Sequence, residues 1–125
     1  MHMKDLSDLL KPETFEKDEP VGIAAVAVAL LPGPIDESNW KYISERLWSR
    51  LLCLGAAYQL HFHHVMEPVI DTVLLPEQCE SLAKELHFLI DVTTDPALQQ
   101  AIGVFIQEAR TVVNRPHMRL VISPP

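Results

Sequence analysis

Residues 21–31 read Val-Gly-Ile-Ala-Ala-Val-Ala-Val-Ala-Leu-Leu, an unbroken apolar run between Pro20 and Pro32. A run that is apolar on both alternating faces is typical of a strand buried on both sides or of a buried helix, and periodicity does not separate the two. Its β-branched residues and the flanking prolines favour the strand. We therefore expect a buried strand here, with small alanines that let a helix pack closely.

The segment after this run predicts a helix and then a change of period. Asp36 can cap the helix, and apolar residues follow at spacings of three and four. They are Trp40, Ile43, Leu47, Leu51, Leu54 and Tyr58. Gly55 can mark the end of the helix. Residues 58–64 then alternate in polarity, which predicts a half-buried strand, although the helix could instead continue through Phe62.

The second half of the chain predicts two helices between two strands. Residues 69–75 predict a strand, and Pro76 suits the first position of a helix. The core stripe of that helix is Cys79, Leu82, Ala83, Leu86, Leu89 and Ile90. Asp95-Pro96 begins the next helix, which Asn114 and Pro116 end. Residues 118–122 predict the last strand.

The resulting order, β-α-β-β-α-α-β, predicts the fold class. We expect an α+β fold with a small mixed sheet of three to four strands and about three helices packed mainly on one face. At 125 residues and 48% hydrophobic content, the chain can form one core, since a chain of this size buries roughly two-thirds of its unfolded surface. We predict a single domain over residues 1–125, in which residues 1–19 are a charged, partly flexible N-terminal segment.

The N-terminus and the cysteines predict a location. No secretion signal is visible, and the longest apolar run, residues 21–31, is far shorter than the about 20 residues of a membrane span. Cys53 and Cys79 form no disulfide or metal motif. Both lie in apolar stripes, so we expect two buried thiols in a reducing compartment. These features predict a soluble, cytoplasmic protein.

The net charge of −7 is concentrated in one part of the chain. Residues 67–95 carry seven acidic side chains against the single Lys84, whereas residues 96–125 have a net charge of +2. An acidic surface repels phosphates, so we expect neither nucleic acid nor a membrane as a partner. Such a surface attracts a basic protein, although the same charge would also serve solubility alone.

Phe88 is the candidate anchor of a binding surface. It is out of register with the core stripe and shares a side of its helix with Glu77, Ser81 and Lys84. An exposed aromatic residue among carboxylates is typical of an interface. Alternatively, another part of the chain covers Phe88, such as the apolar residues of the N-terminal segment. The predicted partner-binding residues are Glu77, Glu80, Lys84, Glu85, Phe88, Asp91 and Asp95.

The histidines are the candidates for a metal site. On a strand, His61 and His63 would point the same way, and His64, Glu67 or His117 could complete a set. Solvated histidines are the more common outcome, so we predict no metal and no cofactor. The sequence contains no nucleophile motif and no phosphate-binding glycine array. We therefore expect a protein that is not an enzyme.

Three segments together resemble a known class of proteins. They are Leu-Leu-Pro-Glu-Gln-Cys-Glu-Ser-Leu-Ala-Lys-Glu-Leu-His-Phe-Leu at 74–89, Asp-Pro-Ala-Leu at 95–98 and Arg-Leu-Val-Ile at 119–122. In layout and charge, roughly residues 69–123 resemble small bacterial immunity proteins of polymorphic and contact-dependent toxin systems. The resemblance implies a cytosolic inhibitor that binds a basic toxin domain stoichiometrically, and it implies no particular site residue. The alternative is a small homodimeric structural or regulatory domain that associates through Phe88 and the terminal strand.

Overall fold

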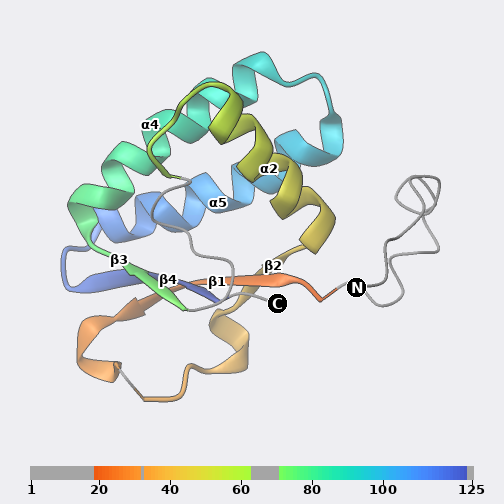
Figure 1. The fold of residues 1–125 in the computed structure, drawn as a ribbon. Helices are drawn as coiled ribbons and strands as arrows, with labels where there is room; N and C mark the ends of the chain where they lie inside the picture. Colours follow the sequence, from red (N-terminus) through yellow and green to blue (C-terminus); the bar gives the residue numbers. More distant parts are fainter. Residues whose placement is uncertain (1–18, 32, 63–70, 124–125) are drawn as a thin grey trace.

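The computed structural model describes residues 19–31, 33–62 and 71–123. Four strands form one sheet in the order β2-β1-β4-β3: β1 (Val21–Ala27), β2 (Lys41–Ile43), β3 (Thr72–Leu74) and β4 (Met118–Ser123). Three helices lie together on one face of this sheet (Figure 1): α2 (Glu45–Ala57), α4 (Pro76–Val92) and α5 (Pro96–Asn114). The connection from β1 to β2 lies on the other face and contains two short 3₁₀ helices, η2 (Val28–Leu30) and η3 (Glu37–Asn39).

The predicted α+β class, with its helices on one face, is confirmed. Two details of the prediction are wrong. All three strand pairings in the described part are antiparallel, so the sheet is not mixed. The described elements follow the order β-β-α-β-α-α-β, so the second strand precedes α2 instead of following it.

β1 is the strand that the apolar run predicts, and it is an inner strand of the sheet. It pairs with β2 on one side and with β4 on the other. Val21 and Ile23 belong to the core under the helices, whereas Ala24 and Val26 belong to a smaller core on the opposite face. Because both faces are covered, the whole strand is apolar. β1 is shorter than the predicted run, since residues 28–30 form η2.

The apolar stripe that predicted one helix from Trp40 is divided between two elements. The hydroxyl of Ser44 caps α2, so the three residues before it stay extended and pair with β1 as β2. Trp40 instead packs on the opposite face of the sheet. Asp36 does act as a cap, but of η3, where its carboxylate accepts the N–H of Ser38 at 3.0 Å.

Residues 58–61 form a turn and not the predicted strand. α2 continues past Gly55 to residue 57, and Gln59 then adopts a left-handed conformation with φ of 57°. This turn folds Phe62 back into the core, where a Cβ on Gly55 would lie 2.7 Å from Cζ of the phenyl ring. Residues 63–70 cover the rest of this prediction and the first residues of the strand predicted at 69–75, and they lie outside the described residues.

The predicted starts of the two long helices are confirmed, and so is the predicted end of α5 at Asn114. Pro76 and Pro96 occupy first-turn positions, and the Asp95 carboxylate accepts the N–H of Ala97 at 3.0 Å. The predicted stripe of α4 is buried, apart from the half-buried Ile90, and α5 buries a stripe of its own that includes Phe105 and Val112. α2 also packs on this core, and its buried residues are Trp48, Leu51 and Gly55.

The two cysteines differ in environment. Cys79 is buried, and burial raises the pKa of its thiol to about 12, which keeps it protonated and unreactive at neutral pH. Cys53 is exposed, so the prediction that it is buried is wrong. The side of α2 that faces the core is set by Trp48 and Leu51, and Cys53 lies off that side.

Two glycine-to-alanine substitutions test the packing of Phe62 on Gly55. We expect them to change the free energy of unfolding in opposite directions. Gly55→Ala places a methyl group against the Phe62 ring, and we expect it to lower the free energy of unfolding by about 1–3 kcal/mol. Gly103 in α5 has no atom within 4 Å of the position of a Cβ, so Gly103→Ala should raise it by about 0.5–1 kcal/mol. Urea unfolding followed by circular dichroism measures both. Equal effects of the two substitutions would contradict the described contact.

Candidate functional site

The candidate site is the solvent-facing side of α4. The core stripe of this helix turns inward, so the residues between its members face outward. Five of these exposed residues lie along one side of the helix, and we call them the α4 ridge: Glu77, Glu80, Lys84, Phe88 and Asp91. At 1.5 Å per residue, the ridge extends over about 21 Å along the helix. It carries three carboxylates and one ammonium group, so it is acidic overall.

Phe88 lies on the ridge in contact with a second exposed aromatic residue. Its side chain is 41% exposed, and that of Tyr58, the residue that follows α2, is 47% exposed. The two rings meet edge to face, with centroids 5.2 Å apart and planes at 80°. The sequence predicts that Tyr58 belongs to the apolar, core-facing stripe of its helix. The pair forms only because α2 ends beside α4, which no local pattern shows.

Glu80 and Lys84 form the ion pair that the sequence predicts. The Lys84 ammonium lies 3.9 Å from the Glu80 carboxylate, and both side chains are mostly exposed. An exposed i,i+4 pair of this kind contributes only a few tenths of a kcal/mol. The pair therefore leaves Glu80 available to a partner while it neutralises part of the charge beside Phe88.

Glu85 has a structural role, unlike the other acids of α4. Its carboxylate accepts the N–H of His61 at 2.7 and 3.0 Å and that of Phe62 at 3.2 Å. These charge-assisted bonds fasten the turn after α2 to α4. The sequence predicts that Glu85 binds a partner. A substitution that removes its charge would disturb the turn, so it would not measure a contact with a partner.

Asp95 also lies apart from the ridge. Besides capping α5, its carboxylate forms an ion pair with Arg50 of α2. The two contacts tie the start of α5 to α2 and use both oxygens of the carboxylate. Five of the seven predicted residues thus lie on one face of α4. Glu85 and Asp95 instead form contacts that stabilise the fold.

Asp91 occupies an unfavourable position for an acid. It lies in the last turn of α4, where the free carbonyl groups carry partial negative charge and where no basic residue is present. It forms no hydrogen bond or ion pair with another residue in the described ranges. A carboxylate there costs roughly 0.3–1 kcal/mol. Glu77, in the first turn of the same helix, has the stabilising position instead.

The structure describes only part of the set of candidate metal-binding histidines. His61 is exposed in the turn that Glu85 holds, and His63, His64 and Glu67 lie outside the described ranges. Within residues 19–31, 33–62 and 71–123, no group of three or more His, Cys, Asp or Glu side chains could hold a metal ion.

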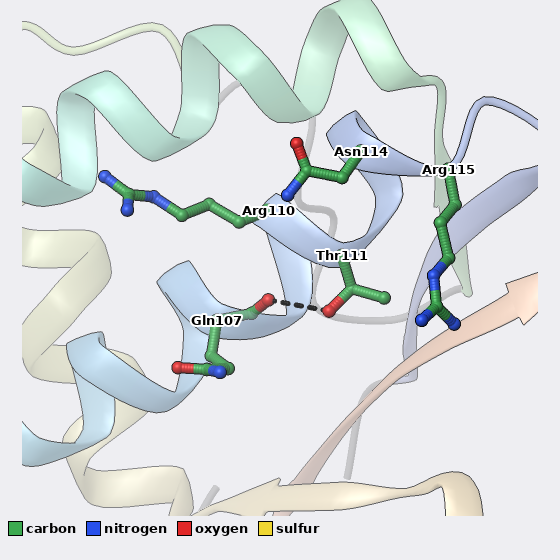
Figure 2. A pocket seen from close by; sticks show the side chains of 5 residues that line it. All are labelled: Gln107, Arg110, Thr111, Asn114 and Arg115. Atoms are coloured by element: carbon green, nitrogen blue, oxygen red, sulfur yellow. Dashed lines mark hydrogen bonds between the residues drawn. The ribbon is translucent and has the colours of Figure 1, made fainter.

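Side chains of the opposite charge line a surface depression on α5. Its volume is about 370 Å³, and Figure 2 shows the lining residues Gln107, Arg110, Thr111, Asn114 and Arg115. The arginine side chains extend in different directions, and the Thr111 hydroxyl donates to the carbonyl of Gln107 at 3.0 Å. Arg110 also contacts the Nε2 atom of His87 on α4. The depression therefore has no pair of arginines converging on one anionic group.

A scan against protein-family models, a search of curated proteins and a search of solved structures found no match to this chain. In the described part of the chain, no helix is long and apolar enough to cross a membrane.

The structural role of Glu85 predicts different effects for two neutralising substitutions on one helix. Glu85→Gln replaces one carboxylate oxygen with an NH₂ group that cannot accept a hydrogen bond, and we expect a loss of about 1–2 kcal/mol in the free energy of unfolding. Glu80→Gln, the exposed control, should change it by less than about 0.5 kcal/mol. Thermal unfolding and amide hydrogen exchange at His61 and Phe62 measure the effect. Unchanged exchange at these two amides in Glu85→Gln would be incompatible with the assigned role.

Proposed function

We propose that this chain is a protein-binding module that binds a basic partner protein through the α4 ridge. One observation carries the proposal. Asp91 is an acid at the helix end where its charge is unfavourable, and it lies one turn from the half-exposed Phe88. Solubility alone does not require a carboxylate at the helix end where it is unfavourable. A basic partner would stabilise that carboxylate on binding.

The ridge has the composition of an interface with an apolar centre and a charged rim. Phe88 and Tyr58 supply the aromatic contact area, and Glu77, Glu80 and Asp91 supply the charge. Charges arranged in this way accelerate association with a basic surface. Because exposed charges are screened beyond about 8 Å at physiological ionic strength, we expect the rate to fall as salt is added.

Within this function we propose a stoichiometric inhibitor of the immunity-protein type, acting in the cytoplasm without catalysis. The support is the acidity of residues 67–95, the small size and the layout that resembles this class. The partner would be a basic toxin domain whose active site the ridge covers. A specific complex of this kind buries about 1,200–2,000 Å² in total, an area that a ridge of this length and the surface around it can supply.

The alternative, a homodimer that associates through the terminal strand, agrees less well with the sheet. β4 pairs with β1 on one side and with β3 on the other, so it has no free edge for a second copy. Self-association through Phe88 is a separate outcome, and light scattering over a concentration series detects it.

Neutralising the acid at each end of α4 tests the proposed function. Asp91→Asn should raise the free energy of unfolding by about 0.3–1 kcal/mol, because it removes an unfavourable charge from the C-terminal turn. Glu77→Gln should lower it by a similar amount. Both substitutions should slow association with a basic partner, since both remove a charge that attracts it.

Where a toxin domain is encoded next to the gene of this chain, that domain is the partner for this measurement. Stopped-flow association with that domain gives the rates, and thermal unfolding gives the stabilities. Opposite changes in stability together with parallel losses in association rate are the expected result. If neither substitution alters association, the ridge is not the binding surface and the proposal is wrong.

A further inference from the structure

The aromatic pair on the ridge has open ring surface and a negatively charged neighbour. Phe88 and Tyr58 meet edge to face, and each keeps close to half of its surface exposed. The face of an aromatic ring carries partial negative charge and attracts cations. Asp91 follows Phe88 at the i+3 position, so its carboxylate lies on the same side of the helix. Ring and carboxylate therefore attract the same kind of group.

Two further residues decide which cation fits. Val92, at i+4 from Phe88, is 37% exposed and offers apolar surface to the methylene stem of a long basic side chain. Lys84, at i−4 from Phe88, would repel a cation, but Glu80 lies 3.9 Å from its ammonium and offsets that charge. The surroundings of Phe88 thus favour a long cationic side chain.

We propose that the Tyr58–Phe88 pair, with Asp91, recognises an arginine side chain of the partner. This inference rests on the proposed function and names the group that the partner contributes. A guanidinium is planar, so it can stack on the exposed ring while two of its N–H groups donate to the Asp91 carboxylate. A lysine ammonium is more strongly hydrated and does not stack in this way. The structure therefore assigns a preference for arginine over lysine to this position.

The experiment uses the full chain and two short capped peptides, in which glycine alternates with arginine or with lysine. NMR titration gives the affinity for each peptide, and the arginine δ-methylene signals report stacking because protons above a ring face shift upfield. We expect about a two- to five-fold preference for the arginine peptide. Phe88→Leu, which keeps an apolar side chain without a ring, should remove both the preference and the upfield shift.

Tyr42→Leu is the matched control. Tyr42 is 52% exposed and its hydroxyl donates to the Glu37 carboxylate at 2.8 Å, so it is also an exposed aromatic residue beside an acid. It lies on β2 and not on α4. Its replacement should leave the preference for arginine unchanged.

The outcomes separate this inference from the proposed function. If Phe88→Leu and Tyr58→Leu keep the arginine preference while Asp91→Asn weakens both peptides, stacking is wrong and the acidic binding surface stands. If Asp91→Asn and Glu80→Gln also leave both affinities unchanged, the proposed function falls as well. A loss of stability in Phe88→Leu as large as that of a core residue, or a dimer that this substitution dissociates, would show that the chain itself covers the ring and would overturn the inference.

Discussion

The burial of β1 on both faces is the constraint on which the other elements depend. The helices cover the side of Val21 and Ile23, and residues of the β1–β2 connection cover the side of Ala24 and Val26. The three helices cover one face of a sheet of four described strands. α4 therefore buries one side in the core. Its other side remains in solvent, and that side carries the acids and Phe88.

Long apolar stripes made most of the fold predictable. α4 and α5 each repeat a buried position often enough that the period alone identifies them, whereas β1 is identified by its β-branched residues and flanking prolines. β2 and the turn at residues 58–61 were not predictable in the same way. β2 is extended because Ser44 caps the helix inside what otherwise continues a helical stripe. The turn depends on the left-handed Gln59 and on bonds to Glu85, 23 and 24 residues away.

The candidate site was predictable as a charge but not as a set of contacts. The sequence locates the acidic stretch and the out-of-register Phe88, and the structure places both on one side of α4. The sequence alone does not distinguish acids that face solvent from acids that form contacts within the fold. Asp95 pairs with Arg50 across 45 residues, and Tyr58 reaches Phe88 only through the packing of two helices. These distant contacts reduce the predicted set and add one aromatic residue to it.

A hydrogen-exchange footprint of the complex with the basic partner tests the proposed surface. Bound and free chains are compared amide by amide after the same exchange times. We predict new protection between Glu77 and Val92 and at the end of α2 near Tyr58, with no change in the β1–β2 connection on the far face of the sheet. Protection confined to that connection, or to the α5 depression around Arg110 and Arg115, would contradict the assignment of the α4 ridge as the binding surface.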